Sequence, residues 1–230
     1  MPKNQKDICY SDLKQRILSM SLEPGSPLDE TRLAEAYGIS RTPMREVLQR
    51  LAGAGFATLE DNRGAKVASM DIATMRIFFQ TAPMVYANIA RLAAEHRTDA
   101  QVAELRKAQE AFSKANAEAD ANFAALANYR FHEVIGEMAH NPYLMAALAR
   151  MLIDHTRLSQ TFYRPKSEQE QDLVTKAQSQ HDDMIDAITG GDVDRATELT
   201  LQHWDLSKDR MERFVRPDPL PLDLAELERT

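Results

Sequence analysis

The stretch Ser40-Arg41-Thr42-Pro43-Met44-Arg45-Glu46-Val47-Leu48-Gln49-Arg50-Leu51 has the pattern of a short amphipathic helix. Its apolar residues recur at three- and four-residue spacing and predict a core-facing side, formed by Met44, Val47, Leu48 and Leu51. Its other side carries Arg41, Thr42, Arg45 and Gln49. Ser40 or Thr42 can cap the first free amides, and Pro43 suits a first turn. The helix tip therefore combines arginines with the positive end of the helix dipole, which suits an anion.

The residues around this stretch predict a helix-turn-helix followed by a hairpin. Residues 10–21 have helical spacing, and Pro24-Gly25 ends them with a turn. Asp29 can cap a second helix that runs through Tyr37 and closes on Gly38. Residues 56–60 and 65–69 flank a turn-rich segment and predict a small β-hairpin, a candidate wing.

Two interpretations of the basic helix remain open at this point. Charged stripes on helices are often only solvated faces, and the arginines alone do not exclude that. A capped helix that follows a helix and a tight turn, and precedes a hairpin with Arg63 at its tip, favours the other interpretation. In that arrangement a recognition helix enters the major groove while a wing touches the backbone or the minor groove.

Length and composition predict a globular protein of two modest domains. The 230 residues are 43% hydrophobic and 27% charged, enough to bury real cores. Cys9 is the only cysteine, so no intramolecular disulfide can form and a reducing compartment is expected. The sequence has no long uncharged apolar run, and its polar start lacks the apolar region of a signal peptide. We therefore expect a cytoplasmic protein without a membrane partner.

The charge is divided unevenly along the chain, although the formal net charge is −7. Residues 1–70 hold 10 lysines and arginines against 9 acidic residues, whereas the rest holds 18 against 26. Nucleic-acid binding needs only a local positive potential, and repulsion keeps an acidic part away from phosphates. This division assigns DNA contact to the first part and another task to the second.

From Asp71 onward the pattern is helical almost throughout, with breakers confined to short joints such as Asn141-Pro142 and Gly190-Gly191. The fold class is therefore mainly α: a winged helix-turn-helix over residues 1–70, then an antiparallel bundle of six or seven helices over 71–216. Residues 217–230 contain three prolines and are expected to be a flexible tail. Pro83 should either kink its helix or lie in its first turn.

Three of the six histidines stand where a core-facing side chain is expected. His132 lies four residues after Asn128 on one helical face, so two donors converge there. His181 adjoins an apolar stripe, and His203 lies beside Leu199 on the last helix. A lone helical histidine is usually structural, but three that face the core of an acidic bundle suggest a metal.

The first part resembles the GntR family of bacterial transcription regulators. The resemblance covers residues 8–70 and rests on Leu22 to Glu30, Leu33-Ala34-Glu35, Ser40 to Leu48, and Arg63-Gly64-Ala65-Lys66-Val67. It implies contact of Arg41, Thr42 and Arg45 with bases or nearby phosphates, a wing at Arg63 and Gly64, and a homodimer on a two-fold operator. Arginine can pair bidentately with guanine, and a glycine permits close backbone approach. The full expected DNA-contacting set is Arg32, Ser40, Arg41, Thr42, Arg45, Arg63 and Gly64.

Residues 75–215 are similar to the FCD effector domain of the FadR-like branch of that family. The resemblance rests on Asn128-x-x-x-His132, Asn141 to Leu144, His181, Ala187 to Ala196, and His203. It implies that three histidines and an aspartate hold a divalent ion, zinc or nickel, and that a small organic acid can complete the coordination of this ion. Asn128, a weaker ligand, stands at the aspartate position. Ala82 and Tyr86 stand where many members have arginine and glutamate, so the effector, expected to be a carboxylate, is not inherited from any one relative.

Two further classes of function compete with a regulator. A three-histidine metal site with an open position also describes hydrolytic zinc enzymes. The residue four beyond His132 is Gly136, however, so the two-histidine protease helix is absent, and no general base is evident. A metal- or ligand-binding module with a vestigial DNA reader is the other class, and the intact arginines argue against it.

Overall fold

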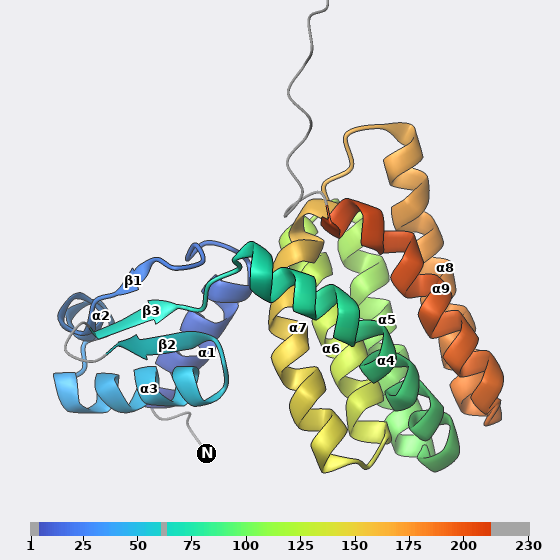
Figure 1. Cartoon of the computed structure of the whole chain (residues 1–230), viewed down its shortest axis with the longest axis horizontal. Helices are drawn as coiled ribbons and strands as arrows, with labels where there is room; N and C mark the ends of the chain where they lie inside the picture. Colours follow the sequence, from blue (N-terminus) through green and yellow to red (C-terminus); the bar gives the residue numbers. More distant parts are fainter. Residues whose placement is uncertain (1–4, 61–63, 213–230) are drawn as a thin grey trace, which may run out of the picture.

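The computed structural model describes residues 5–60 and 64–212, and all statements below concern these residues. They form nine helices and three short strands in two adjoining parts (Figure 1). The predicted class, mainly α with a winged helix-turn-helix and a helical bundle, is confirmed. We call residues 5–70 the reader domain and residues 71–212 the bundle.

The reader domain combines three helices with a small antiparallel sheet. Its elements are α1 (Gln5–Leu18), β1 (Pro27–Leu28), α2 (Glu30–Tyr37), α3 (Arg41–Gly53), β2 (Ala57–Glu60) and β3 (Gly64–Val67). The predicted hairpin is β2–β3, with Thr58 opposite Lys66. Strand β1 adds a third strand in the order β1-β3-β2, which the sequence did not predict because two residues carry no periodicity. The hairpin tip at 61–63, and with it Arg63, lies outside the described residues.

Caps and burial explain the predicted helix-turn-helix. The Asp29 carboxylate accepts from the backbone amides of Thr31 and Arg32, and Gly38 closes α2 with φ 65°. The predicted core-facing side of α3 is buried, namely Met44, Val47, Leu48 and Leu51. One detail was wrong: Ser40 occupies the N-cap position of α3, but its side chain makes no capping hydrogen bond. Its backbone carbonyl still accepts from the Met44 amide at 3.3 Å.

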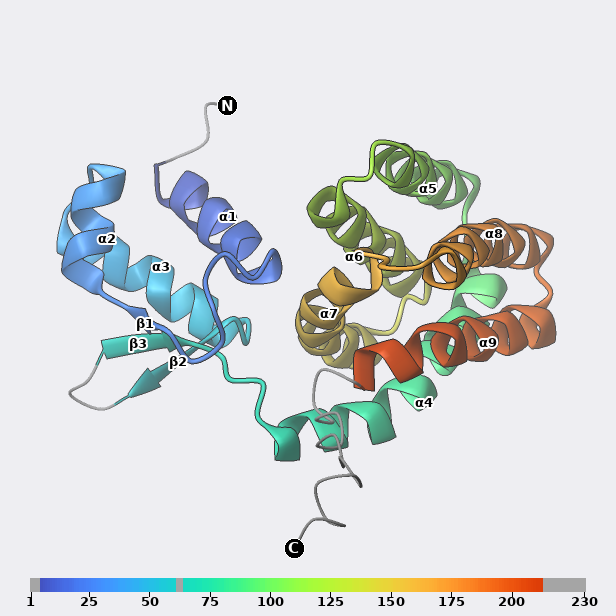
Figure 2. The same ribbon diagram turned by 90° about the horizontal axis from the view of Figure 1, so that it is seen from above.

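The bundle has six helices, within the predicted number. They are α4 (Ile72–His96), α5 (Asp99–Ala117), α6 (Ala121–Met138), α7 (Pro142–Phe162), α8 (Glu168–Gly190) and α9 (Val193–Glu212). Seen from above, α6 lies between α5 and α7, and α9 lies between α8 and α4 (Figure 2). Thr98 and Gln101 form a reciprocal capping box at the start of α5. Asn141 caps α7 ahead of Pro142.

Pro83 lies in the interior of α4, so its alternative placement in a first turn was wrong. It has no amide hydrogen to donate to the preceding turn, and α4 continues through it with buried residues on both sides, such as Phe78 and Tyr86. Among the described residues, no helix is long and apolar enough to cross a membrane.

One apolar cluster runs through both parts of the molecule. It includes Leu13 and Leu51 of the reader domain together with Phe78 and Leu152 of the bundle. A smaller cluster around Phe112 fills the end of the bundle near α5 and α8. The two parts therefore share a packed boundary, which α7 forms on the bundle side by contacting α1. The division at residue 70 and the flexible tail at 217–230 stay predictions, and the tail lies outside the described residues.

Candidate DNA interface and metal centre

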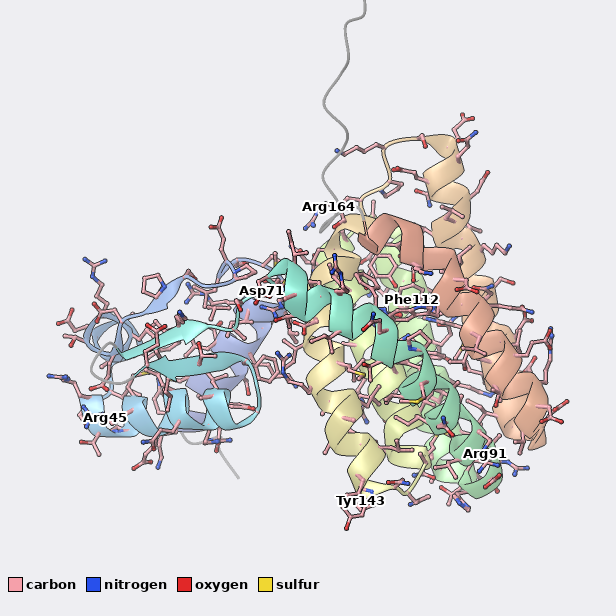
Figure 3. The ribbon with its side chains drawn as sticks, viewed as in Figure 1. Arg45, Asp71, Arg91, Phe112, Tyr143 and Arg164 are labelled. Atoms are coloured by element: carbon pink, nitrogen blue, oxygen red, sulfur yellow. The ribbon has the colours of Figure 1, made fainter. Side chains whose placement is uncertain are left out.

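The first turns of α3 present two arginines to solvent. The side chains of Arg41 and Arg45 are 65% and 61% exposed, so both guanidinium groups can reach a ligand. Arg45 lies on the side of the reader domain that faces away from the bundle (Figure 3). Because the core-facing side of α3 is buried, its polar side is held outward in a fixed direction.

Glu30, the first residue of α2, holds both of these arginines. Its carboxylate accepts from Arg41 Nε at 3.0 Å and from Arg45 Nε at 2.9 Å, and Arg45 Nη2 adds a third contact at 3.1 Å. Hydrogen bonding by Arg45 is the largest of the effects that lower the pKa of Glu30. The carboxylate therefore stays ionised and orders two long side chains before any DNA is present.

Of the other predicted DNA-contacting residues, four lie within the described part of the reader domain. Ser40 and Thr42 are exposed at the start of α3, and Arg32 is exposed on α2 with its Nε 4.0 Å from Asp29. Gly64 starts β3 with φ 84° and has open space at its Cβ position. A cavity of about 190 Å³ between α3 and the sheet is lined by Glu30, Arg45, Leu48, Gln49, Leu59, Glu60, Gly64 and Ala65.

Arg50, on the same helix, takes part in the internal packing of the reader domain. Its Nη1 donates to Asp7 at 2.9 Å, and its guanidinium lies 4.4 Å from the centre of the Tyr10 ring. It thus links α3 to α1.

Three of the predicted metal ligands meet in the interior of the bundle. His132 on α6, His181 on α8 and His203 on α9 each offer a ring nitrogen, and these three nitrogens lie within 4.8 Å of one another. Their side chains are buried, with His181 fully excluded from solvent. His181 also stacks on Phe131 at 3.9 Å between ring centroids. These histidines are separated by 49 and 22 residues in the sequence and come together because three different helices converge here.

Two glutamines contact the imidazole rings of His181 and His203 at their Nδ1 atoms. The Gln109 amide donates through Nε2 to the Gln178 carbonyl and to Asp182, both at 3.0 Å. Its Oε1 therefore faces His181 Nδ1 at 2.9 Å, and Nδ1 must carry the hydrogen. Gln180 Oε1 lies 3.2 Å from His203 Nδ1 in the same way. Such partners orient histidine rings and leave Nε2 free for a metal.

The residues present fit a divalent ion. Asn128 Oδ1 and His132 Nε2 are buried without any hydrogen-bond partner, although buried polar atoms are normally satisfied. An imidazole nitrogen and an amide oxygen are both ligands of divalent transition metals. Asn128 lies one helical turn before His132 on α6, so the predicted fourth donor shares the face of the cluster.

A fourth buried histidine, which the sequence interpretation passed over, lies beside this cluster. The ring of His155 on α7 is 5.3 Å from that of His132, and its Nδ1 is 2.7 Å from the Tyr86 hydroxyl. Tyr86 on α4 is itself in edge contact with His132. Leu148 and Leu152 precede His155 on the buried face of α7, and this spacing was the available signal.

Burial keeps all four imidazoles neutral. It lowers the pKa of His203 to about 4 and that of His155 to about 3. Burial also lowers the pKa values of His132 and His181, with further contributions from the neighbouring imidazoles. The side chains that hydrogen-bond or stack on these rings are neutral as well, namely Gln109, Gln180, Tyr86, Phe112, Phe131 and Trp204. Neutral imidazole is the form that binds metals.

Comparison with protein families assigns both parts of the chain. Residues 6–67 match the family described as bacterial regulatory proteins, gntR family, and residues 84–206 match the FCD domain. The protein belongs to the GntR family. Both resemblances that were noted in the sequence are thereby confirmed.

This GntR-family chain has relatives of known and unknown function. It is 26% identical to the galactonate operon transcriptional repressor of Escherichia coli, over 87% of this chain and 94% of that protein. It is 27% identical to the uncharacterised regulator YdhC of Bacillus subtilis, over 59% of this chain and 61% of that protein. The chain thus spans about three fifths of YdhC and 42% of the nta operon regulator of Aminobacter aminovorans.

Solved structures show the same fold. E. coli McbR/YncC superposes with a TM-score of 0.76 at 18% identity, over 92% of this chain and 99% of that one. A GntR regulator from Rhodococcus sp. RHA1 superposes with a TM-score of 0.66 at 15% identity, over 94% and 100%. At these identities the likeness concerns the arrangement of helices and strands.

Proposed function

We propose that this GntR-family protein is a cytoplasmic transcription regulator. Its reader domain binds operator DNA as part of a homodimer, and a ligand in the bundle changes the operator affinity. The observation that carries the proposal is the pair of exposed, preordered arginines, Arg41 and Arg45, at the tip of α3 beside the wing. The acidic bundle supports it because repulsion from phosphates leaves DNA contact to the reader domain.

Operator binding can be tested on the full chain. A duplex selected from a random pool by the wild-type protein serves as the operator. The Arg45→Ala variant should bind it about 1–3 kcal/mol more weakly if Arg45 pairs with a base. Arg106→Ala is the matched control, because Arg106 is a half-exposed arginine that pairs with Asp186 on the bundle. Equal affinities of wild type and Arg45→Ala would contradict the assignment, as would affinity that ignores salt.

We further propose that His132, His181 and His203 hold a divalent metal ion, zinc or nickel, with Asn128 as a weak fourth donor. The buried, unpartnered atoms Asn128 Oδ1 and His132 Nε2 support this. When bound, the ion supplies a positive centre for an anionic oxygen. Because all the protein donors are neutral, the site stays positively charged and suits a small carboxylate effector. The relative named for the galactonate operon, the operon of a sugar acid, agrees with this class.

Metal and effector are tested together. Elemental analysis of purified protein should find one zinc or nickel ion per chain, and the thermal midpoint should rise with small organic acids. His181→Ala should lose both the metal and the response to acids. A metal-free wild type that cannot be loaded, or an acid response that survives in His181→Ala, would contradict the site.

Catalysis is the weaker alternative. Glu133, the acidic residue next to His132, does not serve the cluster as a general base. Its carboxylate is engaged by Arg130 at 2.6 Å. The neutral glutamines behind His181 and His203 also differ from the carboxylates that accompany histidines in many hydrolytic sites. A ligand-binding module with a vestigial reader would not need Glu30 to order two arginines on the surface.

A further inference from the structure

The reader domain meets α7 at the ends of three of its elements. At the end of α1, the Leu18 carbonyl accepts from Gln160 Nε2 at 3.2 Å. Just after β3, the Ala68 carbonyl accepts from Arg157 Nη1 at 2.7 Å. After α3, a Cβ on Gly55 would come within 2.6 Å of Arg150 Cδ. In Figure 2, α7 lies at the edge of the bundle that faces the reader domain, together with α6 and the start of α4.

The side chains on α7 come from a single face of the helix. Arg150 and Arg157 are seven residues apart, which is close to two full turns, and Gln160 follows after three more. Contacts at three separated points define the orientation of one rigid body on another. The two carbonyl contacts involve polar side chains that are almost fully buried, at 1% and 3% exposure for Arg157 and Gln160.

Arg157 is a costly residue to bury at this boundary. Its Nη2 pairs with Asp154, whose other oxygen accepts from Arg150 at 3.1 Å, but its Nε has no partner. Burial lowers the pKa of the Arg157 guanidinium, which reflects the desolvation of its charge. Well-packed apolar residues often stabilise a protein as much as a buried ion pair. A buried polar group can instead specify a single geometry, because its hydrogen bonds are satisfied in one arrangement only.

We propose that Arg157 and Gln160 are positioning residues that set the orientation of the reader domain on the bundle. They thereby determine the spacing of half-sites that the dimer accepts. This inference rests on the proposed operator binding by a homodimer. Half-sites on one face of DNA lie about 34–36 Å apart, so two rigidly mounted reader domains can reach both only at the matching separation.

Operators with altered spacing test this directly. Inserting two base pairs between the half-sites moves one of them by about 7 Å and rotates it by about 70° around the duplex. A rigid wild-type dimer should then bind through one reader domain only and lose about 10²–10⁴-fold in affinity. The Arg157→Met and Gln160→Leu variants, alone and combined, should lose less than about tenfold, because a freed reader domain can follow the moved half-site.

Two further variants serve as a matched control and as a conservative substitution of Arg157. Arg164→Met removes an arginine that follows α7 and, among the described residues, donates to Gln160 O and Asn122 Oδ1 within the bundle, so its spacing penalty should equal that of wild type. Arg157→Lys keeps one donor and should recover part of the penalty. Asp154 keeps Arg150 as a partner in Arg157→Met, and Gln160→Leu tests the proposal without a change of charge.

The readout separates positioning from general stability. A variant that is merely less stable would bind the original and the lengthened operator more weakly by the same factor, and that result would overturn the proposal. A spacing penalty in both variants as large as that of wild type would overturn it too. Failure of the wild type to select any operator would instead contradict the proposed function itself.

Discussion

The Nε2 atoms of His181 and His203 face each other at a distance of 3.2 Å. The amide of Gln109 is oriented by two pure acceptors, so His181 carries its hydrogen on Nδ1 and presents a lone pair at Nε2. Gln180 Oε1 lies 3.2 Å from His203 Nδ1, and when this oxygen accepts the Nδ1 hydrogen, the second Nε2 presents a lone pair as well. Two lone pairs at this distance repel, and a cation bound by both nitrogens would remove that repulsion, which supports the proposed metal site.

Gln109→Leu should lower zinc affinity without removing a metal ligand. The leucine cannot accept from His181 Nδ1, so the ring loses both its orientation and its tautomer preference. Loss of such supporting partners typically costs about 10–100-fold in metal affinity. Competition with a chromophoric chelator measures the change. Gln202→Leu on the exposed side of α9, where the amide donates to Glu198, is the control, and equal affinities in both variants would argue against a role for Gln109.

Asn128→Asp should raise zinc affinity. The Asn128 Oδ1 atom is buried and unpartnered one helical turn before His132, and a carboxylate at this place would add a charged oxygen ligand to an otherwise neutral donor set. We expect a gain of about tenfold or more, equivalent to about 1.4 kcal/mol. The same substitution should destabilise the metal-free protein, because it buries an uncompensated charge. A variant whose metal-free stability falls while its zinc affinity does not rise would place the ion elsewhere.

The metal-free protein should lose stability as the pH falls below about 6.5. Burial lowers the pKa of His203 from 6.5 to about 4, so between these values the unfolded chain binds a proton that the folded chain does not. The free energy of unfolding therefore rises with pH across this window, by up to about 1.4 kcal/mol per unit for each such histidine. Urea titrations at pH 4.5, 5.5 and 6.5 on chelator-treated protein measure the slope. His203→Gln should reduce the slope by the share of one histidine, since His132, His155 and His181 keep theirs, and an unchanged slope would mean that His203 is protonated in the folded state.

The sequence predicted the fold better than it predicted the surroundings of the metal ligands. Period, caps and breakers act locally, so Asp29, Gly38 and the buried face of α3 could be predicted from a few neighbouring residues. His181 and His203 could be predicted because apolar neighbours on the same helix point inward. Gln109 could not, since its role comes from a contact with a residue 72 positions away.

Contacts between the two parts were hidden for the same reason. Arg157 lies on a helix rich in apolar residues, and nothing in that local pattern indicates that its guanidinium reaches Ala68, 89 positions earlier. Ser40 shows that a local preference can also mislead. A favourable residue type stands at the predicted N-cap, yet its backbone carbonyl, and not its side chain, accepts a hydrogen bond there. Residue preferences describe an average over many proteins, whereas one site has one geometry.

Glu30→Gln should weaken the discrimination between operator and unrelated DNA. The carboxylate orders Arg41 and Arg45 through three charge-assisted hydrogen bonds, and the neutral amide would let both side chains sample more orientations. A well-placed arginine–guanine pair contributes about 1–3 kcal/mol of discrimination, so we expect the ratio of specific to non-specific affinity to fall by an amount in this range. Non-specific affinity itself should rise slightly, because a negative charge is removed beside the phosphates.

Glu35→Gln removes the same charge from the same helix without touching the arginines, since Glu35 is exposed on α2. Both variants should therefore share the small gain in non-specific affinity, and only Glu30→Gln should lose discrimination. Competition between the selected operator and a scrambled duplex at one salt concentration measures the ratio. If the two variants changed the ratio equally, the effect of Glu30 would be that of a charge near the phosphates, and the ordering of Arg41 and Arg45 before DNA binds would have no part in recognition.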